Sequence, residues 1–163
     1  MATVNYNGKT VSDENVKTVL GRVATELDKD VNVSSGDRDS ALDVGAGTKS
    51  LHLKHQAADF HVSGLSDEEG FKQIQEKKDT IFDSDKKYEI IWHGPHTETS
   101  GPHLHIGRYD SGTGTNFKKE GITEEGKGKY TVASGYAAVP SAALAMQQVN
   151  QRRFPRTMKE TTC

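Results

Sequence analysis

The sequence predicts an α+β domain in which a small antiparallel sheet carries helices packed on one of its faces. Segments with helical apolar spacing alternate with short apolar strands along the chain. Turns that contain glycine, asparagine or proline separate neighbouring strands, as β-hairpins require. The length of 163 residues is about that of one domain. Helices that alternate with hairpins typically cover one side of an antiparallel sheet.

Apolar spacing and capping signals predict two helices. Apolar side chains recur every three or four positions over residues 16–27, with Ser12 or Asp13 as the N-cap. Ser66 and Glu69 have capping-box spacing, so a second helix with a narrow apolar face is expected after them. Four strands are predicted, of which the last two form an antiparallel pair: residues 31–33, 57–62, 88–92 and 103–107.

The segments between and after these elements also carry predictions. Asn7-Gly8, within the alternating segment 4–11, predicts a tight hairpin turn. Residues 110–129 are polar and rich in glycine and are predicted to form a mobile loop. We expect one domain over residues 1–140, with the motifs inside 31–108. Residues 141–163 are expected to form a C-terminal helix and a flexible tail.

Composition excludes several classes of protein. No apolar run approaches the roughly 18–20 residues of a membrane span. With 21 basic and 23 acidic residues the net charge is −2, which argues against a dedicated nucleic-acid binder. Cys163 is the single cysteine, so an internal disulfide and a multi-cysteine zinc site are excluded. The first residues lack the basic and apolar regions of a Sec signal, so we expect synthesis in the cytoplasm without one.

All seven histidines lie between positions 52 and 105. His52 precedes Asp59 by seven positions, and His103 and His105 share one face of a predicted strand because strand side chains alternate. Neutral imidazole and carboxylate groups are good zinc ligands. A loop with His52, a strand with Asp59 and a neighbouring strand with His105 can converge on one Zn²⁺ ion. Three protein ligands plus water are typical of a catalytic zinc site.

Three separated motifs resemble one family of metallopeptidases. They are Ser35-Gly-Asp-Arg38, Ser50-x-His52-x6-Asp59 with Ala57 inside it, and Pro102-His103-x-His105. Together they resemble the hedgehog/DD-peptidase fold. Within it, they are similar to the M15 peptidases (D,D-carboxypeptidases and L-alanyl-D-glutamate endopeptidases) and the related LAS metallopeptidases. The resemblance covers about residues 12–108, and it departs from the family at His55, where the family has glycine.

The resemblance implies roles for the matching residues. His52 and Asp59 would be zinc ligands, and Arg38 would hold the carboxylate or carbonyl oxygen of the substrate. In the branch of the fold with an H-x-H motif the second histidine binds the metal. This implies His105 as the third ligand and His103 as a catalytic neighbour, and the choice between the two stays open.

The general base is a separate question. In the other branch of the fold a carboxylate lies three residues before the ligand, but positions 100 and 102 hold Ser100 and Pro102. Glu98, on the turn just before, is the nearest carboxylate and the predicted base. His103 and His96 are the alternatives. The other two strand histidines, His61 and His93, are expected to be structural or exposed.

The resemblance implies a zinc-dependent peptidase that hydrolyses the peptide stems or crosslinks of bacterial peptidoglycan. Zinc lowers the pKa of a bound water from about 15.7 toward ~7, which supplies a nucleophile at neutral pH. We expect a phage lysin or an antibacterial toxin delivered by a secretion system. Such a protein would act in the periplasm or at the cell wall, with an immunity protein or a delivery protein as partner. The alternative is a catalytically inactive, zinc-containing binding module of the same fold.

Overall fold

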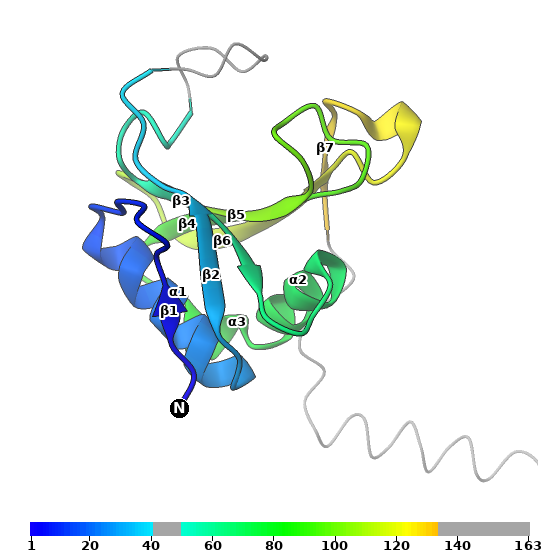
Figure 1. The fold of residues 1–163 in the computed structure, drawn as a ribbon. Helices are drawn as coiled ribbons and strands as arrows, with labels where there is room; N and C mark the ends of the chain where they lie inside the picture. The colour runs from blue at the N-terminus through cyan, green and yellow to red at the C-terminus, as the bar shows by residue number, and fades with distance from the viewer. Residues whose placement is uncertain (41–49, 134–163) are drawn as a thin grey trace, which may run out of the picture.

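The computed structural model describes residues 1–40 and 50–133 of the chain. They form a seven-stranded sheet of order β1-β2-β3-β5-β4-β6-β7, and the three α-helices lie together on one side of it (Figure 1). The strands are β1 (Val4–Asn5), β2 (Val31–Ser35), β3 (Ala57–Val62), β4 (Lys87–His93), β5 (His103–Tyr109), β6 (Gly114–Glu120) and β7 (Tyr130–Val132). The helices are α1 (Glu14–Leu27), α2 (Asp67–Glu76), α3 (Lys78–Ile81) and the 3-10 helix η2 (Glu124–Gly126).

The two predicted helices are confirmed, and so are their starting signals. The Asp13 side chain caps α1 by accepting a hydrogen bond of 2.9 Å from the backbone N–H of Val16. At the start of α2, Ser66 and Glu69 form the reciprocal capping box. In the described residues no helix has the length and apolar character that crossing a membrane requires.

The sheet is larger than predicted and is mixed, not purely antiparallel. Most neighbouring strands are antiparallel, including the predicted β4–β5 pair, but β4 and β6 run parallel. The chain leaves β5, crosses the start of β4 and enters β6 on its other side. Gly112 and Gly114 make this short connection possible, with φ of 97° and 90° that side chains other than glycine rarely adopt. The α+β class is correct, and the prediction of a small antiparallel sheet is correct only in part, because two of the strand pairs are parallel.

Two local predictions also fail. Asn7 and Gly8 have the positive φ angles of a turn, but only β1 precedes them as a strand. That strand pairs in parallel with β2, so no hairpin forms there. Residues 110–129 contain β6 and η2 and are no simple loop, because the Phe117 side chain anchors β6 in the core. The helix and tail predicted for residues 141–163 lie outside the described residues.

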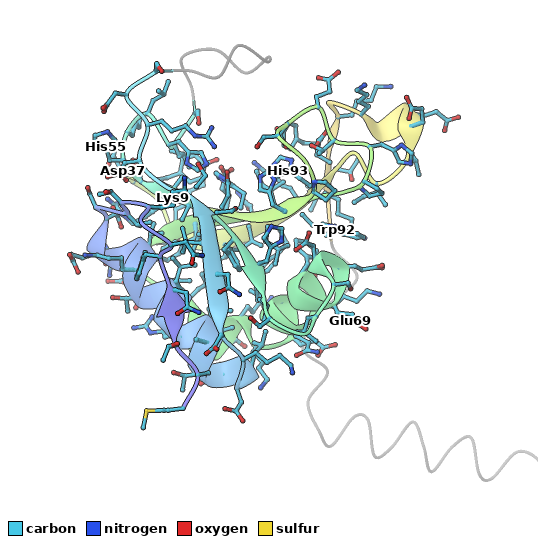
Figure 2. All side chains as sticks on the ribbon, in the orientation of Figure 1. Lys9, Asp37, His55, Glu69, Trp92 and His93 are labelled. Carbon is cyan, nitrogen blue, oxygen red and sulfur yellow. The ribbon has the colours of Figure 1, made fainter. Side chains whose placement is uncertain are left out.

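Alternation along the central strands gives the sheet one apolar and one polar face. Phe60, Ile90 and Leu104 are fully buried in the core beneath the helices. Each contributes roughly 1.5–3 kcal/mol by burial. The residues that alternate with them point away from the helices. Figure 2 shows this for one pair of neighbours, since Trp92 lies toward α2 and His93 lies on the opposite side of β4. The polar face carries the candidate site.

Candidate metal centre

Three elements bring the predicted zinc ligands together. Asp59 in β3 lies directly opposite His105 in β5, because the two residues pair in the strand register. His52 lies in the turn of residues 50–55, where successive backbone N–H groups donate to carbonyls three residues earlier. One ligand atom from each of the three side chains lies within 4.8 Å of the other two. The structure therefore brings these three side chains together, and their role as zinc ligands stays a prediction.

The Asp59 carboxylate is the centre of the cluster. Its Oδ1 atom lies 3.0 Å from His52 Nε2, 3.0 Å from His105 Nδ1 and 3.4 Å from His103 Nε2. All four side chains are buried. Three imidazole nitrogens thus face one carboxylate oxygen, and His103 joins the cluster as predicted.

The outer nitrogen of each ring already has a hydrogen-bond acceptor. His52 Nδ1 lies 2.8 Å from the Gly36 carbonyl, and His103 Nδ1 lies 2.6 Å from the Gly101 carbonyl. His105 Nε2 lies 3.2 Å from Glu89 Oε1. Because these partners only accept, each outer nitrogen carries the hydrogen, and a neutral ring then points its lone pair inward. Lone pairs facing a carboxylate repel it unless a cation or additional protons lie between them.

The donor set fits a zinc ion. Zinc bonds of about 2.0–2.2 Å in tetrahedral geometry place neighbouring ligand atoms about 3.3 Å apart. The two separations of 3.0 Å at Asp59 Oδ1 are close to this value. Glu89 and the Gly36 carbonyl hold the outer nitrogens of His105 and His52, which is how ligand histidines are oriented in metal sites. His52, Asp59 and His105 could therefore hold the ion.

Without a metal the cluster has strongly shifted pKa values. Burial raises the pKa of Asp59, but hydrogen bonds from His103, His105 and His52 outweigh it and hold that pKa well below its usual range. Burial lowers the pKa of His105, and its bonds to Asp59 and Glu89 outweigh burial and raise that pKa to about 9. The His105 ring must lose a proton before its nitrogen can bind a metal ion. Metal binding should therefore release protons.

Arg38 lies at the accessible edge of the cluster. Its guanidinium donates to Asp59 Oδ2 at 3.0 Å and to Ser35 Oγ at 2.9 Å. The glycine between these two motif residues is required by packing, because a Cβ atom at Gly36 would lie 2.0 Å from the Thr10 carbonyl oxygen. The partly exposed guanidinium can also reach a substrate oxygen.

Glu98, the predicted base, does not join the cluster. Its side chain is exposed, and its carboxylate lies beside Gly128. Its backbone N–H faces Glu120 Oε1 at 3.4 Å. Among the described residues, no hydrogen bond connects its side chain to Asp59 or to the three histidines. Its role as base stays a prediction.

Two buried glutamates on the polar face were missed. Glu89 accepts hydrogen bonds from His105 and, at 2.6 Å, from the Tyr109 hydroxyl. Burial raises its pKa, but these bonds and Lys118 lower it to about 2. A glutamate inside the apolar segment 88–92 was a usable signal, because alternation places it on the face of His105. Glu120 lay in the segment predicted as a loop, so no signal for it was available.

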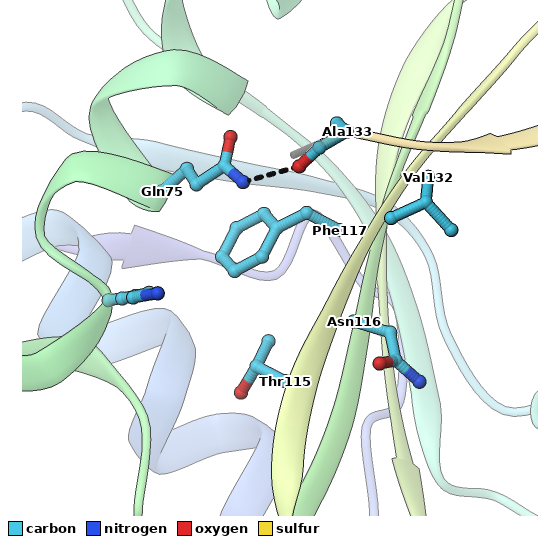
Figure 3. Close-up of a pocket in the computed structure, with 7 residues that line it drawn as sticks. Gln75, Thr115, Asn116, Phe117, Val132 and Ala133 are labelled. Carbon is cyan, nitrogen blue, oxygen red and sulfur yellow. Dashed lines mark hydrogen bonds between the residues drawn. The ribbon is translucent and has the colours of Figure 1, made fainter. Parts of the chain in front are cut away.

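A separate cavity lies on the helix side of the sheet. Its volume is about 200 Å³, and Gln75 of α2, Phe117 of β6 and Ala133 line part of it (Figure 3). Gln75 Nε2 donates to the Ala133 carbonyl at 2.7 Å. No member of the metal cluster borders this cavity.

The polar face of the mixed sheet thus presents a buried His–Asp–His donor set, suited to a metal ion, beside an arginine. The sequence profile described as peptidase M15 matches residues 3–86, about half of the chain. The chain belongs to this family and is therefore a metallopeptidase, as its motifs predicted. The match includes Arg38, His52 and Asp59 and ends before β4. No curated protein matches the chain. No solved structure matches it either.

Proposed function

We propose that the protein is a zinc-dependent peptidase that hydrolyses the peptide stems or crosslinks of bacterial peptidoglycan. One observation carries the proposal: the inner nitrogens of three imidazoles lie 3.0–3.4 Å from one buried carboxylate oxygen, Asp59 Oδ1. Such a donor set favours a cation, and membership of the peptidase M15 family supports peptide hydrolysis. The substrate class follows from the resemblance of the motifs.

Each residue of the candidate site has a role that follows from its position. His52, Asp59 and His105 would hold the ion, and the bound ion would supply a Lewis acid and a water that is acidic enough to attack at neutral pH. Arg38 binds the carboxylate or carbonyl oxygen of the substrate, because its planar fork of donors suits an oxygen anion. His103 lies beside the Asp59 carboxylate and can hydrogen-bond the substrate there.

The setting in which the protein acts is part of the proposal. A peptidase for peptidoglycan works in the periplasm or at the cell wall, as a phage lysin or as a toxin delivered by a secretion system. A toxin would have an immunity protein that covers the polar face of the sheet.

A second function is a zinc-containing binding module without catalysis. The exposed position of Glu98 favours it, because the predicted base lies outside the cluster. This module would keep the His52–Asp59–His105 site and bind wall peptides without cutting them.

Purified sacculi distinguish the two functions. The protein is incubated with sacculi and Zn²⁺, and the released fragments are analysed by mass spectrometry. The peptidase should create new amino and carboxyl ends, and Arg38→Ala should create far fewer at a Zn²⁺ concentration that saturates both proteins. One zinc per chain with no new ends would contradict the peptidase and support the binding module. A protein that takes up no zinc would contradict both.

A further inference from the structure

A second buried carboxylate lies on the polar face next to the metal centre. Glu120 of β6 is only 2% exposed. It accepts a hydrogen bond of 2.8 Å from His93 Nδ1 and one from the Thr97 hydroxyl. The backbone N–H of Gly128 donates to it at 2.7 Å, and that of Glu98 lies at 3.4 Å. Donors from three segments thus fix this carboxylate in one orientation.

The fixed carboxylate determines the tautomer of His93. A carboxylate at Nδ1 only accepts, so in the neutral ring Nδ1 carries the hydrogen and Nε2 carries the lone pair. His93 Nε2 makes no hydrogen bond within residues 1–40 and 50–133. In those ranges the only fully buried side-chain nitrogen or oxygen atoms without a partner belong to Gln56 and Gln75. Within these ranges the Nε2 atom of His93 therefore has no hydrogen-bond partner and is not fully buried.

The free nitrogen belongs to a ring that borders the metal cluster. The centre of the His93 ring lies 4.6 Å from that of His103 and 6.3 Å from that of His105. Strand register explains the first distance, because His93 and His103 are direct partners across β4 and β5. The Tyr130 ring lies 6.1 Å from His93. An imidazole with a free lone pair thus lies beside the site where the peptide would react.

We propose that His93, held by Glu120, accepts the proton of the attacking water and delivers it to the leaving amine. This inference rests on the proposed peptidase function. One O–H bond of the water breaks and its proton moves to Nε2, while the oxygen bonds to the carbonyl carbon. The C–N bond then breaks, and the proton on Nε2 moves to the leaving nitrogen. One water is consumed, and one carboxyl and one amino group form.

Glu120 acts through His93 and is a positioning residue. Its carboxylate keeps the hydrogen on Nδ1 and stabilises the ring when both nitrogens are protonated. Glutamine in its place can donate its own N–H to Nδ1, which would move the hydrogen of His93 to Nε2 and block the proton acceptor.

The test compares four variants with the wild-type protein on sacculi. His93→Gln should reduce the release of new ends by roughly 10²–10⁴-fold, the usual contribution of general acid–base catalysis. Glu120→Gln should also reduce release, and both variants should keep one zinc per chain. His61→Gln is the matched control, because His61 Nδ1 pairs with Asp67 at 2.8 Å outside the cluster and the ring is partly exposed. It should keep full activity. Glu98→Ala tests the competing base.

Two further measurements separate a catalytic from a structural effect. Nitrogen-15 NMR of the zinc-free protein should show His93 with its hydrogen on Nδ1, and on Nε2 in Glu120→Gln. Free imidazole should restore part of the activity of His93→Ala. Where His93→Ala does not fold, the nearly isosteric Glu120→Gln still decides the tautomer and the activity.

Several results would overturn the inference. His93→Gln with wild-type release would do so, and so would a loss of zinc that parallels the loss of activity. An inactive Glu98→Ala beside an active His93→Gln would assign the base to Glu98. If the wild-type protein itself creates no new ends, the proposed function fails and this inference fails with it. An active wild type with an unaffected His93→Gln overturns the inference alone.

Discussion

Asp59 and Glu120 are both buried carboxylates on the polar face, but they have different partners. Asp59 is surrounded by His52, His103 and His105, whose inner nitrogens can bind a metal ion in place of a proton. Glu120 is held by a hydroxyl, which is not a usual zinc ligand, by backbone N–H groups, which cannot bind a metal, and by the single ring of His93.

The difference shows that burial of a carboxylate does not by itself indicate a metal site. What matters is whether the partners can exchange a hydrogen bond for a bond to the ion. At Asp59 the histidines can, because their outer nitrogens are already held by other acceptors. At Glu120 the partners fix one orientation, so this carboxylate suits the positioning of a ring.

The largest expected effect is a loss of zinc affinity that occurs when the Asp59 cluster is mutated but not when Glu120 is mutated. His52→Ala should lower zinc affinity by more than about a hundredfold, since changes one step outside the ligands already cost about 10- to 100-fold. Glu120→Gln should leave zinc affinity nearly unchanged. Zinc competition with a chromophoric chelator measures both. Equal losses in the two variants would contradict the distinction between the centres.

Removal of zinc should destabilise the folded protein. A metal that binds only the folded state stabilises it by about 4 kcal/mol at roughly 1,000 times its dissociation constant. For a chain of this size that corresponds to roughly 8–16 °C in melting temperature. Calorimetry with zinc and with chelator measures the shift, and Asp59→Asn should show none. A shift of the same size in Asp59→Asn would place the ion elsewhere.

As pH falls, the zinc-free protein should first lose stability because of His93. Burial lowers the pKa of His93 to about 4, against the opposing effect of Glu120, while the unfolded chain has a histidine pKa near 6.5. Between these values the unfolded state binds the extra proton, so stability falls as pH falls from about 6.5 to 4. The loss should reach about 3 kcal/mol. Urea unfolding at pH 7, 5.5 and 4.5 measures it.

His93→Gln provides the control for this pH dependence. Asp59 and Glu89 have folded pKa values below those of the unfolded chain, so their stabilising contributions decline only at lower pH. The variant should therefore lose most of the decrease between pH 6.5 and 4.5. A wild-type stability that stays constant over this range would contradict the prediction.

The smallest expected effect is on zinc affinity when Glu89, which holds the candidate ligand His105, is changed. Glu89→Gln should weaken zinc binding by about 10- to 100-fold, because Glu89 Oε1 accepts from the outer nitrogen of His105. Glu124→Gln is the control, since Glu124 holds the exposed His96 and lies outside the metal cluster. A Glu89→Gln protein with unchanged zinc affinity would show that the strand alone orients His105.

Local signals predicted the parts of the fold that depend on neighbours in sequence. The caps at Asp13 and Ser66, strand β3 and the β4–β5 pair all follow from spacing and turn chemistry. The mixed sheet was missed because β6 skips over β4 to pair on its far side. No nearby residue signals such a long-range pairing, and polar residues such as Lys118 and Glu120 made β6 resemble a loop.

By itself the sequence predicted that His52, Asp59 and His105 would meet, because they belong to short motifs with fixed spacing on a loop and two strands, and the structure brings their side chains together. Only the tertiary structure decided which groups surround that cluster. Glu89 and Glu120 reach the polar face through strand register, and register depends on packing and hydrogen bonds between segments far apart in the chain. For the same reason the structure, and not the spacing of residues, places His93 beside His103.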